Sequence, residues 1–473
     1  MPRLPVRALL VVAAVCACLY WFDTRIYRPY RENQRIRSMY GGAKDACLPA
    51  TCMYAMGDTY SAVRENECVS VRRSPTCLYS DATDGDNAEL QFHTFWAGGG
   101  DGDEPVLTRR QLDMLASLML AHQHRLRTTQ ITLWVPNEDV ARSLVTSTLA
   151  AADGTTVRPW ATFLLRSMPM LTVRAFDVDK LFTGNAMPLG QRIKAVAKQL
   201  LSNIRSMDGD TVALASLSDF VRVAVLHIFG GIYVDMDMLV LRDFAPLVRP
   251  GIAPFVYRWS TTDQMNTAVM ALLPHDDKHN DFINGIDFST QMLTCGLDII
   301  ESSAAGGKGT KDPQIDDMIK SIDRQRLRRM QGVPLSRAFD PRVLTLCLQH
   351  RFSSLSLNQQ ATSPPLKMLA STLFDPLWNV FDGMPLAAQT DAAILPAHCR
   401  TTALALNTFE DVYTLDLRPY VAGNKPVDLA CLAPGAFAFH THGNVDGPVL
   451  PGSFAERVEQ VFADVFVRAS LRN

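Results

Sequence analysis

The chain has 473 residues, of which 47% are hydrophobic and 20% charged, a composition that supports a large buried core in one or two globular domains. Its formal net charge of -2 provides no overall positive field for a phosphate polymer, which argues against nucleic-acid binding. A small anionic ligand can still bind at a local site.

The first segment is an uncharged apolar run over residues 8–22 that ends in three aromatic residues. It is shorter than the ~20 residues of a standard spanning helix, but its aromatic end and flanking arginines are typical of membrane interfaces. We therefore predict a cytoplasmic tail at 1–7 and a signal-anchor transmembrane segment at 8–22, as in a single-pass type II membrane protein.

Two alternatives remain open for this apolar segment. Val15, Cys16 and Ala17 form a small-residue pattern that suits signal-peptidase cleavage and release of a secreted protein, and a buried core helix is the other alternative. Charge also opposes the predicted orientation, because arginine favours the cytosolic side. Five arginines between positions 25 and 37 outnumber the two at positions 3 and 7.

Residues 23–87 have little hydrophobic periodicity and are predicted to form a stem. Four cysteines crowd within it: Cys47, Cys52, Cys68 and Cys77. Because their spacings lack the C-x2-C pairs typical of zinc sites, we predict disulfides in an oxidising lumen. Four more cysteines are scattered along the rest of the chain: Cys295, Cys347, Cys399 and Cys431. These are either paired or simply buried.

Strand and helix patterns alternate in the chain that follows the stem. Short strand-like apolar runs lie within 89–100, 130–139 and 171–182. Helical patterns occupy about 112–124 and about 138–151. Alternation of this kind predicts an α/β fold in which helices cover both faces of the sheet, and we treat residues 88–473 as one domain.

A predicted helix and twin glycines precede the most informative residues. Apolar residues follow a helical period over 211–229, and Gly230 with Gly231 predicts a left-handed cap that ends the helix. Asp219 and Arg222 are three residues apart on this helix, so they share a face and can contact each other.

The strand that follows carries two carboxylates to its end. In an extended strand, Asp235 and Asp237 share one face with Tyr233, near the carboxyl end where open α/β sheets form ligand crevices. Carboxylate oxygens favour Mg2+ or Mn2+, ions that typically bind a few carboxylates together with substrate phosphates. The helix, the twin glycines and the strand can fold back as a hairpin that places Asp219 and Arg222 over this acidic cluster.

The stretch from Ser218 to Asp237 reads Ser-Asp-x-x-Arg, an apolar helix and Gly-Gly-x-Tyr-x-Asp-x-Asp. This pattern resembles the sugar-binding region of DXD-motif glycosyltransferases, a group that includes fungal mannosyltransferases, α1,4-galactosyltransferases and the clostridial glucosylating toxins. The resemblance implies a GT-A fold, which is a Rossmann-like mixed sheet with helices on both faces, in residues 88–473 as a catalytic domain. It also implies a nucleotide-sugar donor and a bound Mn2+ or Mg2+.

The resemblance implies roles for five residues of this stretch. Asp235 and Asp237 would engage the metal, the donor ribose and the diphosphate. Asp219 and Arg222 would hold the donor sugar and stabilise charge as its bond breaks. Tyr233 would lie in the donor-binding site.

Other matches to the family pattern are weaker. His93 and Trp96 fit a His-x-x-Trp pattern on the first strand, where the tryptophan of similar enzymes stacks on the nucleobase. Asn266 would lie on the acceptor side. The family commonly ends with a histidine-rich segment near the metal, and the candidates for it are His440, His442 and Asn444.

The resemblance implies a retaining hexosyltransferase that acts on a glycan, glycolipid or glycoprotein acceptor. Together with the apolar N-terminal segment and the cysteines, it predicts a Golgi membrane protein with a luminal catalytic domain. The residues themselves fix neither the stereochemical outcome nor the general base. One alternative is a phosphotransferase or hydrolase with two metals, which predicts further ligands beside the strand, where residues 239–241 are apolar instead. The other is an inactive sugar- or nucleotide-binding module.

Overall fold

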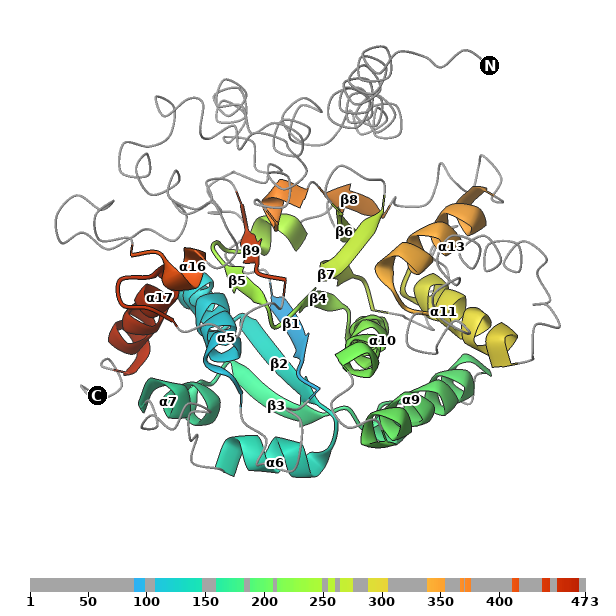
Figure 1. Ribbon diagram of the computed structural model, residues 1–473, viewed down its shortest axis with the longest axis horizontal. Coiled ribbons are helices and arrows are strands. Elements are labelled where there is room, and N and C mark those ends of the chain that lie inside the picture. The colour runs from blue at the N-terminus through green and yellow to red at the C-terminus, as the bar shows by residue number, and fades with distance from the viewer. Residues whose placement is uncertain are drawn as a thin grey trace, which may run out of the picture.

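The structure is a computed structural model, shown as a ribbon in Figure 1. It describes residues 89–97, 107–146, 159–182, 188–206, 211–248, 254–259, 264–274, 288–304, 338–353, 366–369, 371–375, 411–416, 436–442 and 449–467. The predicted tail, anchor and stem lie outside these ranges with their cysteines, and they stay predictions. Within the ranges, no helix has both the length and the apolar character that crossing a membrane requires.

A mixed sheet forms the centre of the molecule (Figure 1), with the strand order β3-β2-β1-β4-β7-β6-β8. Strands β3, β2, β1 and β4 run parallel, β7 is antiparallel to β4 and β6, and β8 is parallel to β6. Their bounds are β1 Leu90–Phe95, β2 Thr129–Val135, β3 Leu171–Ala175, β4 Gly231–Val234, β6 Phe255–Arg258, β7 Met265–Leu272 and β8 Lys367–Leu369. The three strands predicted from short apolar runs are therefore confirmed, as is the mixed sheet.

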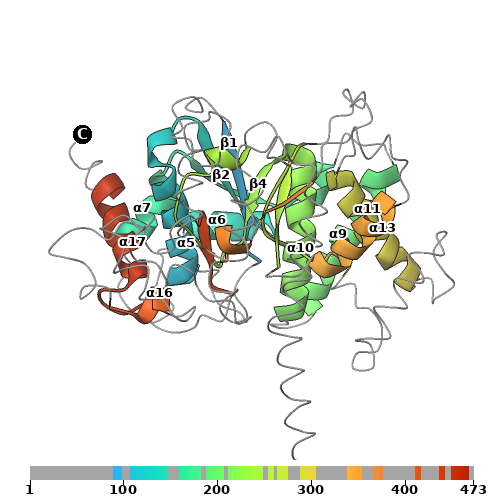
Figure 2. The same ribbon diagram turned by 90° about the horizontal axis from the view of Figure 1, so that it is seen from above.

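Helices cover both faces of this sheet, as predicted. Figures 1 and 2 show α5, α7, α16 and α17 on one side and α9, α10, α11 and α13 on the other. The helices are α5 Arg109–Ala121, α6 Glu138–Thr146, α7 Pro159–Ser167, α8 Val178–Leu181, α9 Pro188–Ser206, α10 Thr211–Phe229, α11 Phe288–Ala304, α13 Pro341–Ser353, α16 Asp411–Thr414 and α17 Phe454–Phe462. Single turns are η2 Gln123–Arg125, η3 Ala245–Val248, η6 Ser371–Leu373 and η10 Ala463–Val467.

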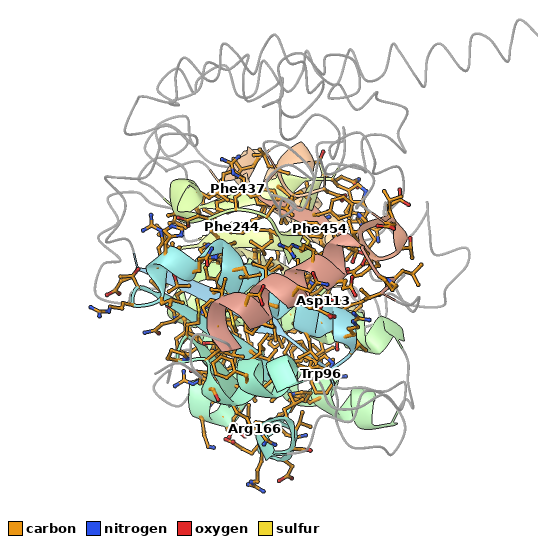
Figure 3. The ribbon with its side chains drawn as sticks, turned by 90° about the vertical axis from the view of Figure 1, so that its left-hand side faces the viewer. Trp96, Asp113, Arg166, Phe244, Phe437 and Phe454 are labelled. Carbon is orange, nitrogen blue, oxygen red and sulfur yellow. A yellow bond between two sulfur atoms is a disulfide. The ribbon has the colours of Figure 1, made fainter. Side chains whose placement is uncertain are left out.

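Each face of the sheet carries its own hydrophobic core. Alternate residues of β1 serve the two cores, because side chains of a strand point to opposite faces. Phe92 packs in the core on the α5 side, and Phe95 packs in the core on the α10 side. Figure 3 views the α5 side, where the side chains of Phe244 and Phe437 lie together with ring centroids 5.8 Å apart.

The predicted helix bounds are partly wrong. Helix α5 begins at Arg109 instead of residue 112, because Thr108 forms a capping box with Gln111 at the helix start. It ends at Ala121, and the residues that follow form a single 3-10 turn. Helix α10 has the bounds that its apolar period predicts.

A second, two-stranded sheet joins distant parts of the chain. Strand β5, Met238–Val240, pairs antiparallel with β9, Ala438–His440, so that Met238 lies opposite His440. Helix α5 supports this sheet through Ser117, whose hydroxyl accepts the N–H of Val240 at 3.0 Å. The pairing places His440 next to Asp237.

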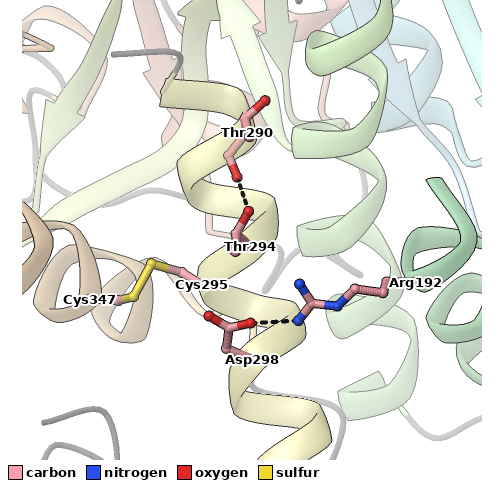
Figure 4. Close-up of a disulfide and its surroundings, with 6 residues drawn as sticks. All are labelled: Arg192, Thr290, Thr294, Cys295, Asp298 and Cys347. Atoms are coloured by element: carbon pink, nitrogen blue, oxygen red, sulfur yellow. Dashed lines mark hydrogen bonds and ion pairs between the residues drawn. A yellow bond between two sulfur atoms is a disulfide. The ribbon is translucent and has the colours of Figure 1, made fainter. Parts of the chain in front are cut away.

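A disulfide between Cys295 and Cys347 links α11 to α13 (Figure 4). The sequence left these two cysteines as either paired or buried, and they are both. They are 52 residues apart, so closure of this loop stabilises the fold by about 4 kcal/mol in the chain-entropy description.

Candidate active site

The twin glycines turn the chain from α10 into β4. Gly230 has φ 65° and Gly231 has φ 87°, backbone conformations that favour glycine. The N–H of Gly230 donates to Leu226 O at 2.9 Å and ends the helix. A Cβ atom on Gly231 would lie only 2.4 Å from Gln91 O, so β1 also requires glycine here. The predicted left-handed cap is confirmed.

The two aspartates lie just beyond β4, which corrects the prediction that an extended strand carries them both. The strand ends at Val234, and Asp235 N still donates to Ala268 O at 2.8 Å. The chain then turns, because Met238 N donates back to Asp235 O at 3.3 Å. The side chains of Asp235 and Asp237 are 18% and 29% exposed, so they lie neither in bulk solvent nor sealed in the core.

Arg222 is the centre of the predicted hairpin. Its Nη2 atom lies 3.0 Å from Asp235 Oδ1 and 3.1 Å from Asp219 Oδ1. Nη2 also donates to Ser218 Oγ at 3.2 Å, and Nη1 donates to Thr267 Oγ1 at 2.8 Å. The hairpin therefore brings Asp219 and Arg222 against Asp235, as the sequence predicts, and it holds the guanidinium in one orientation.

Tyr233 completes this group from the strand side. It is fully buried, and Arg222 Cζ lies 5.1 Å from the centroid of its ring. Its hydroxyl lies 3.2 Å from Ser218 Oγ. Burial raises the pKa of Tyr233, so the phenol stays neutral at physiological pH. Tyr233 thus supports the guanidinium by a cation–π contact and anchors Ser218.

Three carboxyl groups lie close together at this site, and their surroundings shift their pKa values in different directions. Burial raises the pKa of Asp219 to about 7 and that of Asp235 to about 6, although Arg222 acts in the opposite direction on both. Burial would also raise the pKa of Asp237, but His440 outweighs it and the pKa is lowered. One arginine thus faces several carboxyl groups, an arrangement that a divalent cation would complete.

Asp237 contacts the C-terminal segment through both its backbone and its side chain. Its carbonyl accepts hydrogen bonds from the N–H of Thr441 at 2.9 Å and from the Thr441 hydroxyl at 2.7 Å. Its Oδ2 atom lies 3.2 Å from His440 Nε2. Its Oδ1 atom is buried and finds no hydrogen-bond partner among the described residues. The structure therefore brings His440, a weak sequence candidate, directly to the aspartate pair.

His442 lies beside His440 but contacts a residue that the sequence did not indicate. The two imidazole rings stack with their centroids 3.8 Å apart. His442 Nε2 lies 2.8 Å from Asp375 Oδ2, and His440 Nδ1 lies 3.6 Å from the same oxygen. Asp375 follows the turn η6 and lies in no recognisable motif, so only the tertiary fold reveals it.

His93 lies on β1, where both of its ring nitrogens form hydrogen bonds within the scaffold. Its Nδ1 accepts the indole N–H of Trp134 at 3.1 Å, and its Nε2 donates to Gly230 O at 3.1 Å. Trp96 follows β1 at the carboxyl edge of the sheet, as Asp235 follows the neighbouring strand β4. Its side chain is only 5% exposed and packs in the core on the α5 side. Stacking of Trp96 on a nucleobase stays a prediction.

The last two candidates are Asn266 and Asn444. Asn266 is buried in β7, where its Oδ1 accepts the N–H of Ala268 at 2.9 Å. It precedes Thr267, the residue that contacts Arg222, and Thr267 itself was missed because an isolated threonine in a strand carries no functional signal. Asn444 lies outside the described residues, so its role stays a prediction.

Residues 171–251 match the family model described as glycosyltransferase sugar-binding region containing DXD motif. The predicted family resemblance is confirmed. The matched segment includes Asp219, Arg222, Asp235 and Asp237 of the DXD site, whereas the histidines of β1 and β9 lie outside it. A search of curated proteins finds no significant match to the chain.

Several solved glycosyltransferase structures are similar to the chain. The PaToxG glycosyltransferase is 14% identical, with a TM-score of 0.31, over 63% of this chain and 91% of that one. The UDP-bound glycosyltransferase domain of the YGT toxin is 10% identical, with a TM-score of 0.34, over 63% of this chain and 82% of that domain. These scores describe a loose similarity, and we transfer no residue role from these structures.

The chemistry of the DXD site fits a divalent cation. Asp237 Oδ1 is a buried carboxylate oxygen that lacks a protein donor within the described residues, and such an atom is costly unless a ligand completes it. Asp235 adds oxygen ligands at the same turn. Oxygen-rich sites of this kind suit Mn2+ or Mg2+ together with the oxygens of a diphosphate.

Proposed function

We propose that the protein is a glycosyltransferase that moves a hexose from a nucleotide-sugar donor to a glycan, glycolipid or glycoprotein acceptor. One observation carries the proposal: Arg222 is held between Asp219 and Asp235, next to Asp237 with its open carboxylate oxygen. The family match to the DXD region supports it, and the mixed α/β sheet is compatible with the GT-A fold that the motif implies.

Transfer breaks the bond between the anomeric carbon and a phosphate oxygen, so negative charge grows on the departing nucleoside diphosphate. A divalent ion at Asp235 and Asp237 supplies Lewis-acid stabilisation of this charge when it is bound. Arg222 adds a positive charge that is already oriented by Thr267 and Ser218, so it needs no reorganisation during the reaction.

The remaining residues of the site are assigned to donor binding. Asp219 would accept hydrogen bonds from hydroxyl groups of the donor sugar, and Tyr233 would keep Arg222 in place. Trp96 would stack on the nucleobase at the carboxyl edge of the sheet, and Asn266 would lie toward the acceptor. Retention of configuration is proposed from the family resemblance alone.

We also propose that the enzyme works in an oxidising compartment, as a type II protein of the Golgi membrane. The Cys295–Cys347 disulfide supports this address, because disulfides persist in oxidising lumens and are rare in the cytosol. Release as a secreted protein is the alternative for the same compartment chemistry.

One alternative activity gains support from the structure. A two-metal phosphotransferase or hydrolase requires further ligands beside the aspartates. The neighbouring residues of β5 are apolar, but Asp375, His440 and His442 reach the same place from distant segments. Product analysis distinguishes the two activities, because glycosyl transfer releases a nucleoside diphosphate and a pyrophosphohydrolase would release a nucleoside monophosphate.

The decisive experiment is a screen of nucleotide sugars for turnover in the presence of Mn2+. We expect release of a nucleoside diphosphate with one donor, and a loss of at least about 100-fold in Asp237→Asn, since charge stabilisation of the leaving group depends on this carboxylate. Asp139→Asn is the matched control, because this carboxylate is 91% exposed on α6. Full activity of Asp237→Asn would reject the assignment, and donor binding without turnover in the wild type would indicate the inactive module.

A further inference from the structure

Three potential metal ligands converge outside the DXD motif. They are Asp375, His440 and His442, and their ligand atoms all lie within 4.8 Å of one another. Asp375 is the shared partner, since both histidines approach its Oδ2 atom. Two imidazoles and one carboxylate form a ligand set that proteins use for transition metals.

The cluster contains a buried oxygen that a ligand would satisfy. The side chain of Asp375 is 4% exposed, and its Oδ1 atom has no hydrogen-bond partner in the part of the chain that the structure describes. Most buried carboxylate oxygens in proteins accept a hydrogen bond or bind an ion. Oδ1 of Asp375 is therefore an independent sign that a cation belongs at this cluster.

The backbone holds the three ligands in place. Asp375 N donates to Ser371 O at 2.6 Å, and His440 N donates to Phe374 O at 3.0 Å, so the segment that carries Asp375 is tied to β9. His442 has φ 56°, a left-handed conformation that is unfavourable for a residue other than glycine. Such strain persists where the surrounding structure fixes a functional side chain.

The two nitrogens of His440 separate this cluster from the DXD aspartates. Its Nε2 atom faces Asp237 Oδ2 at 3.2 Å, whereas its Nδ1 atom faces Asp375 Oδ2 at 3.6 Å. Because these nitrogens diverge from the imidazole ring, one ion cannot bind both. A histidine that binds a metal through one nitrogen typically donates its other N–H to a carboxylate, which is the role that Asp237 offers here.

We propose that Asp375, His440 and His442 form a second cation site, selective for a divalent transition metal of the Zn2+ class. The ligand atoms are His440 Nδ1, a ring nitrogen of His442 and the carboxylate of Asp375. Asp237 serves both sites: Oδ1 faces the DXD cation, and Oδ2 orients His440. The proposal goes beyond the glycosyltransferase function, which requires the DXD cation alone.

The two sites should prefer different metals, because their ligand atoms differ. Imidazole nitrogen favours Zn2+ and Co2+ over Mg2+ and Ca2+, which prefer oxygen ligands. The DXD turn offers carboxylate oxygens for Mn2+ or Mg2+. The second site should therefore keep its ion under conditions in which Mg2+ occupies the DXD turn.

Tyr257 provides an internal competitor for the second ion. Its hydroxyl lies 3.0 Å from His440 Nδ1, the nitrogen that would bind the metal. Binding of the ion requires this hydroxyl to move aside, and Tyr257→Phe should therefore bind the ion more tightly than the wild type.

Cobalt titration of the full-length, chelator-treated protein tests the proposal, with visible absorption to detect imidazole ligation and excess Mg2+ present to occupy the DXD turn. We expect one equivalent of imidazole-bound Co2+ that Zn2+ displaces. Asp375→Asn and His442→Ala should lose this equivalent, whereas Asp235→Asn should keep it. His124→Ala is the matched histidine control, because this side chain is 52% exposed and contacts Asp243.

Several outcomes would overturn the second site. Absence of the cobalt spectrum in the wild type is one. Retention of the full signal in both Asp375→Asn and His442→Ala is another, provided that circular dichroism shows folded variants. Loss of the signal in Asp235→Asn would show a single shared ion instead of two. None of these measurements depends on turnover, so they are independent of the failure or success of the proposed transferase activity.

Discussion

Two pairs of histidines that are largely withdrawn from solvent differ in their partners. The scaffold histidines, His93 and His122, use both ring nitrogens in hydrogen bonds to neutral groups: His122 Nδ1 donates to Leu118 O at 2.7 Å, and its Nε2 accepts the N–H of Phe244 at 3.0 Å. The nearest carboxylate oxygen to His122 Nε2, Asp243 Oδ1, lies further away at 3.5 Å. The site histidines, His440 and His442, face the carboxylates of Asp237 and Asp375 instead.

Electrostatics separates His440 from the two scaffold histidines, although all three are buried. Burial lowers the pKa of His93 and of His122 to about 4. Burial acts in the same direction on His440, but Asp237 and Asp375 outweigh it and raise the pKa to about 10. A buried histidine therefore indicates a functional site when its hydrogen-bond partners are charged and incompletely satisfied, and a structural role when both of its nitrogens already form hydrogen bonds to neutral groups.

The largest expected effect concerns the stability of the fold in acid. The pKa of each scaffold histidine has its ordinary value near 6.5 in the unfolded chain and is about 4 in the folded protein. Between these values the unfolded chain binds more protons, so stability is complete above about pH 6.5 and is lost as the pH falls toward 4. We expect a loss of about 3 kcal/mol for each histidine over this range.

Denaturant unfolding of the full-length protein at several pH values between 7.5 and 4.5 measures this loss. The carboxyl groups also titrate in this range, so the comparison is with His93→Gln and His122→Asn, which lack the titrating rings. Both variants should be less stable at pH 7.5 but should lose less stability on acidification. If the free energy of unfolding of both variants fell with pH as steeply as that of the wild type, the scaffold histidines would be protonated in the folded protein.

Local sequence signals predicted the first half of the site correctly. Helix α10 and its glycine cap follow from apolar periodicity and from two adjacent glycines, both of which act within a few residues. The contact of Arg222 with Asp219 follows from helical spacing. The end of β4 was predicted wrongly, because pairing with β7 stops near Asp235 and sequence alternation carries no information about the length of a partner strand.

Long-range contacts explain what the sequence did not reveal. His440 reaches Asp237 only because β5 pairs with β9. Asp375 reaches His440 because the turn after β8 bonds to the same segment. Neither contact has a fixed spacing along the chain, so a histidine in a polar segment and an aspartate before a proline look like ordinary loop residues. The scaffold role of His93 was equally hidden, because it depends on Trp134 of a neighbouring strand.

A crossed pair of substitutions sharpens the comparison between the two groups. His440→Gln should weaken Mn2+ binding to the DXD site by about 10–100-fold, because His440 orients the metal ligand Asp237 and loss of such a partner typically has an effect of this size. His93→Gln should leave Mn2+ affinity little changed but lower the free energy of unfolding, because a buried carbonyl or indole N–H loses its partner.

Isothermal titration with Mn2+ and thermal unfolding, applied to both variants, measure the two effects. The proposed second cation site is kept saturated with Zn2+ in the wild type and in His93→Gln, so that only the DXD site is titrated. His124→Ala serves as the exposed histidine control for both measurements. Equal effects of His440→Gln and His93→Gln on Mn2+ affinity would remove the distinction between scaffold and site histidines.

The smallest expected effect tests a neutral partner inside the charged site. Thr267 is fully buried, and its hydroxyl accepts a hydrogen bond from Arg222 Nη1 at 2.8 Å. Thr267→Val keeps the shape of the side chain but leaves this charged donor without its acceptor, which costs about 1–2 kcal/mol. If Arg222 must be oriented before the leaving group departs, kcat should fall about tenfold with little change in KM or in Mn2+ affinity. Thr267→Ser restores the hydroxyl and should recover most of the rate, whereas a valine variant with wild-type kcat would mean that the ion pairs with Asp219 and Asp235 orient Arg222 without help from a neutral group.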